Sequence, residues 1–167
     1  MEIRKATTEE LYLAREIAEQ TWPVAYSHIL QAGQLRYMLD MFYSDDSLKA
    51  QALQQHHQFL LAVDSGNGCV GFASYSSIHK EEKKLQFKLH KLYVLPNLQK
   101  SGTGKQLLQA VMANALEQGA THLCLNVNRY NTAIDFYKKM GFEVIREEDI
   151  DIGNGYYMID YVMERKL

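Results

Sequence analysis

LQKSGTGKQLL, residues 98–108, is the stretch that decides how the centre of this chain folds. Its two glycines, Gly102 and Gly104, are one residue apart and separate a strand-like run, HKLYVLP (90–96), from a strongly apolar helical pattern. Closely spaced glycines let main-chain amides crowd together and point outward, which suits a helix cap, a phosphate site, or both. The same glycines also suit a tight turn with a close helix–sheet contact and no ligand, so the loop alone leaves both explanations open.

Two phosphate-binding loops are excluded by their spacing. A Walker A loop needs a glycine five positions before Gly104, where Gln99 stands, and a Ser or Thr after Lys105. A dinucleotide-binding fingerprint needs a third glycine where Leu107 stands, and it needs a βαβ unit where this chain has antiparallel strand patterns. Neither Walker-type nucleotide binding nor dinucleotide binding is therefore predicted.

If the loop binds a ligand, the interpretation that remains is a phosphate cradle at the start of a helix. Main-chain amides from about Lys100 to Lys105 converge at the positive end of a helix predicted for residues 103–118, and the two lysines add charge. A diphosphate fits this description. The helix carries one apolar stripe before Gly119 ends it, formed by Leu107, Leu108, Val111, Met112, Ala115 and Leu116.

The rest of the pattern predicts one α+β domain over residues 1–167, with a mixed, largely antiparallel sheet of about six or seven strands flanked by helices. Pro23 is expected to bend or restart the first helix, which follows a capping box at Thr7–Glu10, and the charged run 80–84 is expected to form a hairpin tip. Predicted strands cover about 1–6, 59–63, 69–78, 85–94 and 123–127, with two more in 142–165 around the turn 153–155. Further helices are predicted at about 34–43, 47–55 and 131–141.

Composition favours a small-molecule partner. Lys and Arg number 18 and Asp and Glu 20, a formal net charge of −2, so no basic surplus favours nucleic acid or a membrane surface. The N-terminus lacks the apolar segment of a secretory signal, and no apolar run is long enough to cross a bilayer, so we expect a cytoplasmic protein. Cys69 and Cys124 lack metal-ligand spacing and are expected to be reduced thiols in strands, with no metal site. Exposed strands at the C-terminal edge are compatible with a homodimer.

Two motifs in order resemble a known family. Gln99-x-x-Gly102-x-Gly104, preceded by HKLYVLP and followed by NTAIDFYKKMGF (131–142), is similar to the acetyl-CoA signature of the GNAT superfamily of N-acetyltransferases. The resemblance covers residues 85–142 and implies a sheet splayed at the strand before the glycine loop, with acetyl-CoA as acetyl donor. It implies cofactor contacts by the main chain of Leu92 and Val94, the loop residues Gln99, Lys100, Ser101, Gly102, Thr103, Gly104 and Lys105, and by Asn131, Ala133 and Lys139.

The resemblance also implies parts of a mechanism. An amine that attacks a thioester needs a neutral nitrogen, stabilisation of the oxyanion and a proton for the departing sulfur. The main-chain N–H of Leu92 would face the thioester oxygen. Tyr137 matches the family tyrosine near the sulfur, since a phenol of pKa about 10 can protonate a thiolate whose conjugate acid lies near 8.5. Its spacing alone would favour a core tyrosine, and the motif match is what points to the acid role.

The general base departs from the family pattern. Many members carry a glutamate on the strand where this chain has Lys88, and a lysine inherits that role only if its pKa is strongly lowered. Two residues further, His90 lies on the same strand face and has an ordinary pKa near 6.5, so it is a candidate base. A lone strand histidine also suits a purely structural role.

The residues that would bind the acceptor form no recognisable sequence motif. Trp22, Tyr26 and His28 follow the first helix, where the family builds one wall of the acceptor site, and Tyr157 and Asp160 belong to the last strand, where an opposite wall would form. The layout resembles bacterial small-amine and polyamine acetyltransferases, while peptide termini, lysines and antibiotics stay open as acceptors. Two other functions are considered, a non-catalytic acyl-CoA-binding or sensing domain and a nucleotide-binding regulatory module.

Overall fold

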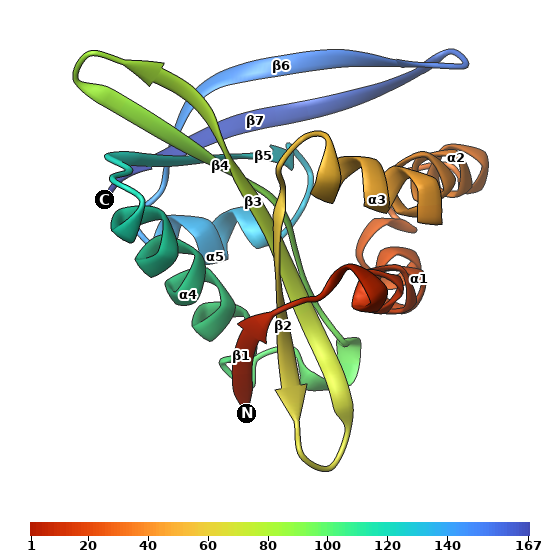
Figure 1. The fold of residues 1–167 in the computed structure, drawn as a ribbon. Helices are drawn as coiled ribbons and strands as arrows, with labels where there is room; N and C mark the ends of the chain where they lie inside the picture. The colour runs from red at the N-terminus through yellow and green to blue at the C-terminus, as the bar shows by residue number, and fades with distance from the viewer.

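A computed structural model describes all of residues 1–167, and its centre is a seven-stranded sheet in the order β1-β2-β3-β4-β5-β7-β6 (Figure 1). Every pair of neighbouring strands is antiparallel except β4 and β5, which are parallel. This confirms the α+β class and the mixed, largely antiparallel sheet. The strands are β1 (Glu2–Lys5), β2 (Gln58–Asp64), β3 (Gly68–Glu81), β4 (Lys84–Val94), β5 (His122–Asn128), β6 (Glu143–Gly153) and β7 (Tyr156–Lys166).

Helices cover both faces of the sheet (Figure 1). α4 and α5 pack on one face over a core that includes Leu107, Val111 and Phe142, and α1, α2 and α3 pack on the other around Trp22 and Tyr43. None of these helices has the length and apolar character needed to cross a membrane. Their bounds are α1 (Tyr12–Tyr26), α2 (Ala32–Tyr43), α3 (Asp45–Leu53), α4 (Thr103–Glu117) and α5 (Ala133–Lys139), with 3₁₀ turns η1 (Thr8–Glu10) and η2 (Pro96–Leu98).

Local signals explain several helix ends. The Glu10 carboxylate accepts a hydrogen bond from the Thr7 N–H at 3.0 Å, so the predicted capping box forms, although it begins the short η1 turn that leads into α1. The Ser44 hydroxyl caps α3 by accepting from the Ser47 N–H at 3.2 Å. Gly119 ends α4 with φ 84°, a left-handed conformation that glycine adopts without strain.

The sheet opens where β4 and β5 separate. Only Gln86–Leu89 of β4 pair with His122–Leu125 of β5, and beyond these residues no hydrogen-bonded ladder joins the two strands. On its other edge β4 stays paired with β3 to the end, but a register shift there leaves His90 without a partner between Leu89 and Lys91. The sheet is therefore splayed at the strand before the glycine loop, as expected, and a bulge lies at the point of splaying.

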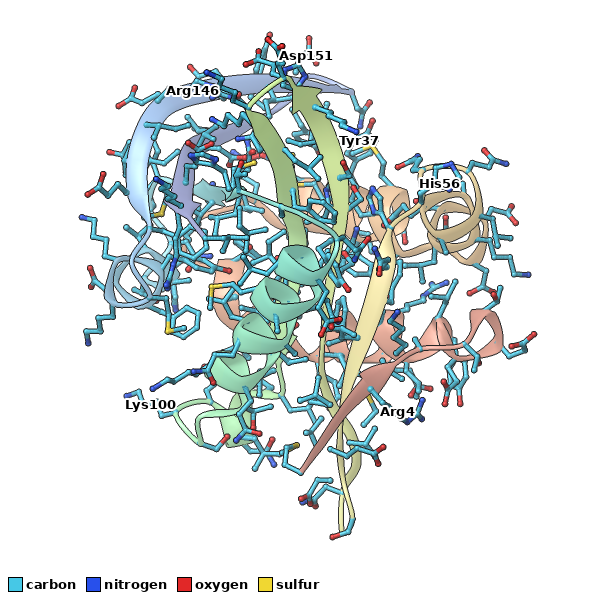
Figure 2. The ribbon with its side chains drawn as sticks, turned by 60° about the vertical axis from the view of Figure 1, so that its left-hand side comes forward. Arg4, Tyr37, His56, Lys100, Arg146 and Asp151 are labelled. Carbon is cyan, nitrogen blue, oxygen red and sulfur yellow. The ribbon has the colours of Figure 1, made fainter.

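The β6–β7 hairpin reaches across the open side of the sheet to α2. The Tyr37 hydroxyl donates to the Ile152 carbonyl at 2.8 Å, and the Gln34 side-chain amide donates to the Tyr157 carbonyl at 2.7 Å. Figure 2 shows Tyr37 below the hairpin that carries Asp151. The hairpin thus joins the two halves of the molecule across the gap between β4 and β5.

Three local details differ from the sequence prediction. Pro23 lies inside α1 without interrupting it, because a proline in the last turn removes only one hydrogen bond of that turn. The run 80–84 does form the hairpin tip, but the turn itself is confined to residues 82–83, because Glu81 still pairs with Lys84. Leu116 is 51% exposed, because the apolar stripe of α4 is narrower than the sequence indicated.

At Gly71, β3 and β4 approach each other so closely that only glycine fits. A Cβ at this position would lie 2.8 Å from the Tyr93 carbonyl oxygen on β4. We expect Gly71→Ala to lower the free energy of unfolding by about 1–3 kcal/mol, because overpacking against backbone forces the strands to shift. Urea unfolding measures this, with Gly66→Ala as control, since its nearest atom would be a side-chain oxygen at 3.7 Å. Equal losses in the two variants would contradict the prediction.

Candidate functional site

A cavity of about 1130 Å³ occupies the gap between β4 and β5. Residues of β4, β5, β7, α1, α2, α3 and α5 line it together with the glycine loop, so it lies where both helical layers and the hairpin meet. It contains these residues predicted as functional: Trp22, Tyr26, His28, His90, Leu92, Val94, Gln99, Lys100, Gly102, Gly104, Lys105, Asn131, Ala133, Tyr137 and Asp160.

The glycine loop presents free main-chain donors at the start of α4. No hydrogen bond within the protein uses the N–H of Gly102, Gly104 or Lys105, whereas the Gln106 N–H donates to the Gly102 carbonyl at 3.0 Å. Lys100 and Gly102 have φ angles of 68° and 88°, so the chain turns sharply before the helix. Figure 2 shows Lys100 on this loop beside the first turn of α4. The donors and the helix dipole together favour an anion.

Gly102 and Gly104 have different reasons to be glycine. Gly102 adopts a left-handed conformation, which a side chain would strain. Gly104 does not, and a Cβ there would meet Val94 and Phe136 only at 3.9 and 4.0 Å, which is ordinary contact distance. Neither backbone conformation nor packing therefore explains Gly104, which lines the cavity.

The end of β4 offers a second set of main-chain groups. The Leu95 N–H donates to the Val70 carbonyl of β3 at 2.9 Å. Because peptide groups alternate along a strand, the N–H groups of Leu92 and Val94 face the opposite edge, which β5 has left. A molecule bound in the opening can therefore hydrogen-bond to these unpaired main-chain groups of β4.

The side chain of Tyr137, on α5, lines the cavity. Its ring packs edge-on against Phe136 and Phe142, with centroids 5.2 and 5.8 Å away, and the residue is 8% exposed. Its hydroxyl makes no hydrogen bond within the protein, yet it is not one of the fully enclosed unpartnered atoms. Burial, reinforced by Tyr26, raises the pKa of Tyr137 well above that of a free phenol, so the group stays protonated at neutral pH.

The predicted aromatic wall divides into core and cavity residues. Trp22 is 4% exposed and packs against Tyr26, Tyr43 and Tyr93, so it mainly fills the core under the wall. The hydroxyls of Tyr26 and Tyr93 are hydrogen-bonded at 3.0 Å and line the cavity. His28 is exposed at its rim.

Asp160 is buried in the middle of β7. It is 3% exposed and is the one carboxylate among the cavity-lining residues. The Asn126 side-chain amide donates to it at 3.3 Å and to Glu148 at 3.0 Å. Burial raises the pKa of Asp160 despite this hydrogen bond and the nearby charge of Lys88. A buried carboxylate without a salt bridge is suited to bind a cation and to accept a proton.

The surroundings of His90 do not suit a general base. Its imidazole stacks on His57, with centroids 3.8 Å apart and planes 8° apart, and its Nε2 hydrogen-bonds with the Ser76 hydroxyl at 2.7 Å. Burial and then the neighbouring His57, Lys91 and Lys88 lower the pKa of His90 to about 2. A group this reluctant to accept a proton is a poor partner for an alkyl ammonium.

Four predicted residues do not line the cavity. Ser101 and Thr103 instead hydrogen-bond to each other at 2.8 Å and shape the loop. Lys139 is exposed on α5, and the Tyr157 side chain is 53% exposed on the hairpin. Several polar residues that line the cavity were not predicted from the sequence, among them Gln51, His57, Lys91 and Asn126.

Comparison with known proteins identifies the family. The profile described as "Acetyltransferase (GNAT) domain" matches residues 29–165. The chain belongs to the GNAT acetyltransferase family. It is therefore an acyltransferase, and the general reaction of such enzymes moves acetyl from acetyl-CoA to an amine.

Several GNAT relatives match almost the whole chain. The spermidine N(1)-acetyltransferase of Thermoplasma acidophilum is 26% identical over 99% of this chain and 97% of its own length. The uncharacterized N-acetyltransferase YuaI of Bacillus subtilis is 24% identical over 90% of this chain and 84% of its own. The crystal structure of PaiA N-acetyltransferase from Thermoplasma acidophilum in complex with coenzyme A superimposes with a TM-score of 0.80 at 27% identity, covering 99% and 98% of the two chains.

Proposed function

We propose that this GNAT chain acetylates a small primary amine by direct attack on acetyl-CoA in a ternary complex. The observation that carries the proposal is that one cavity holds three complementary features. These are the free amides at the start of α4, the unpartnered hydroxyl of Tyr137 and the buried carboxylate of Asp160. The coenzyme A complex of the similar PaiA enzyme supports the choice of donor.

The donor binds along the opening between β4 and α5. The amides of Gly102, Gly104 and Lys105 receive the pyrophosphate, with charge from Lys100 and Lys105, and Gln99 lies beside it. The pantetheine arm follows the free edge of β4 at Leu92 and Val94. The Asn131 side-chain oxygen already accepts from the Ala133 N–H at 2.9 Å, so its NH₂ group is what remains to contact the arm.

Two side chains of the cavity, Asp160 and Tyr137, carry the protons that move in the proposed reaction. Asp160 holds the acceptor ammonium and takes one of its protons, in the role that the sequence had suggested for His90. The neutral nitrogen attacks the thioester carbon, a C–N bond forms, and the Leu92 N–H stabilises the oxyanion. As the intermediate collapses, the C–S bond breaks and the Tyr137 hydroxyl protonates the thiolate. A second proton from nitrogen restores Tyr137, and the Asp160 proton leaves to solvent.

A non-catalytic acyl-CoA sensor is not favoured. A sensor needs the amides that bind the coenzyme, but it has no use for a phenol and a buried carboxylate in the same cavity. Keeping Asp160 buried without a cation costs stability, and a binding site for an amine explains why the cost is tolerated. Released thiol over a panel of amines tests the enzymatic proposal, and no release with any amine would contradict it.

Gly104→Ala tests the donor site separately. Alanine fits the space and favours the helix by up to about 1 kcal/mol, so thermal stability without ligand is expected to hold or rise. The added Cβ occupies the approach of the pyrophosphate, so acetyl-CoA affinity is expected to fall about tenfold or more, as read from ligand-induced thermal shifts. Gly66→Ala, in a distant turn, serves as control. Unchanged affinity in Gly104→Ala would place the pyrophosphate elsewhere.

A further inference from the structure

One arm of the cavity carries nitrogen-bearing side chains that the proposed chemistry does not use. His57, from the loop after α3, and His90 and Lys91, from β4, form this basic arm. The register shift at His90 is a bulge that brings two successive β4 side chains toward α3, where one stacks on His57 and the other reaches Gln51. The arm therefore forms at the bulge that lies where the sheet opens.

Lys91 is held in place by an ordered partner. Its Nζ donates to the side-chain oxygen of Gln51 and lies 5.6 Å from the centroid of the Tyr43 ring. The Gln51 NH₂ group in turn donates to the Phe42 carbonyl at 2.8 Å and to the Ser47 hydroxyl at 2.9 Å, so its oxygen is fixed toward Lys91. This leaves Lys91 with donor capacity directed to the cavity.

The basic arm lacks an anion of its own. None of its three residues takes part in a salt bridge, and the charged groups that influence its histidines are other members of the arm and Lys88. Burial lowers the pKa of Lys91 to about 7, and burial with the two lysines lowers the pKa of His57 to about 4. The enclosed His57 Nδ1 has no hydrogen-bond partner. Such a cluster is stabilised by an anion.

The negative pole of the cavity lies elsewhere. Asp160 is on β7, two strands from β4, with Glu148 behind it through Asn126, and Lys88 stands close enough to influence both carboxylates and the basic arm. The cavity therefore has one carboxylate pole and one basic pole. A ligand that satisfies both has an ammonium and an anionic group.

We propose that the basic arm binds the carboxylate of the acceptor, so that the substrate is a small amino acid or a closely related amino-carboxylate. The proposal rests on the proposed function, since it places the acceptor ammonium at Asp160. A polyamine such as spermidine, the acceptor named for the Thermoplasma relative, would bring a second positive charge into this cavity. Like charges in a partly enclosed site disfavour that arrangement, so this chain is expected to differ from that relative in specificity.

The test compares amines that differ only in the carboxylate. Initial rates of thiol release give kcat/KM for ornithine against putrescine, and for phenylalanine against phenethylamine. We expect each amino acid to exceed its decarboxylated partner by about tenfold or more, because charge-assisted hydrogen bonds to a carboxylate are lost in the amine. Preference for the amines, or for a peptide with a free N-terminus and an amidated C-terminus, overturns the proposal.

Lys91→Met assigns the preference to the basic arm. Methionine keeps an apolar stem of similar length, so the ratio of kcat/KM for amino acid over amine is expected to fall toward one, mainly through KM. Lys83→Met, at the exposed hairpin tip, is the control. If Lys91→Met does not fold, His57→Gln carries the same expectation in smaller degree. An unchanged ratio in a folded variant overturns the proposal. If the wild type releases no thiol from acetyl-CoA with any amine or amino acid, the proposed function itself is overturned.

Discussion

Tyr137→Phe is expected to lower kcat about 10²–10³-fold while acetyl-CoA affinity changes less than about twofold, because the hydroxyl acts only when the sulfur departs. The ring packs between Phe136 and Phe142, and phenylalanine keeps these contacts. The hydroxyl has no protein partner, so its removal leaves no buried group unsatisfied. Stopped-flow or steady-state thiol release gives kcat, and ligand-induced thermal shift gives affinity.

The control for Tyr137 is another buried tyrosine. Tyr75→Phe removes a hydroxyl that accepts from Asn114 at 3.0 Å and donates to Gln58 at 3.1 Å, outside the cavity. It is expected to lose stability and retain kcat, the opposite of Tyr137→Phe. Because burial raises the pKa of Tyr137, the wild-type rate should show no loss from phenol ionisation below about pH 10. Full turnover by Tyr137→Phe would remove this residue from the mechanism.

The donor half of the proposed site is the part that carries a local sequence signal, for a physical reason. Phosphate binding through main-chain amides needs glycines at fixed spacing next to a helix start, so Gly102 and Gly104 reveal the loop directly. Leu92 and Val94 were named from the resemblance to the GNAT signature, and in the structure the N–H groups of both residues face the edge of β4 that β5 has left. Ser101 and Thr103 fell within the motif but face each other, because a motif specifies positions and not side-chain directions.

The acceptor half was less predictable because it depends on tertiary contacts. The bulge at His90 has no sequence signature, and it decides that His90 and Lys91 gather with His57. Burial of Asp160 depends on how β7 joins the middle of the sheet between β5 and β6, a pairing between segments distant in sequence. Asn126 lies within the predicted strand 123–127, and its two carboxylate contacts follow only from that pairing.

Asp160→Asn is expected to lower kcat/KM for the acceptor about 10²-fold or more, since it removes both the ammonium partner and the proton acceptor. Asparagine has the same shape, and its side-chain oxygen can still accept from Asn126. Acetyl-CoA affinity should be unchanged, because the proposed donor contacts lie away from Asp160, on β4, the glycine loop and the start of α5. Rates over a range of amine concentrations separate the effects on kcat and KM.

The same change has an opposite effect on stability. Burial raises the pKa of Asp160, and a carboxyl whose pKa is raised on folding favours the folded state at low pH and loses that contribution as pH rises through its folded pKa. At neutral pH the ionised group is therefore a cost, and Asp160→Asn is expected to unfold at a higher temperature than the wild type. Activity of the wild type should fall as pH decreases through this raised pKa, when the carboxylate takes up a proton.

Glu148→Gln separates the roles of the two carboxylates that share Asn126. Glu148 accepts from the same amide at 3.0 Å but does not line the cavity, so its replacement should keep most of the acceptor kcat/KM. A loss as large as that of Asp160→Asn would mean that the pair acts by orienting Asn126. A gain in thermal stability with full activity in Asp160→Asn would mean that the acceptor ammonium binds elsewhere, because only a functional carboxylate justifies keeping a destabilising charge at this position.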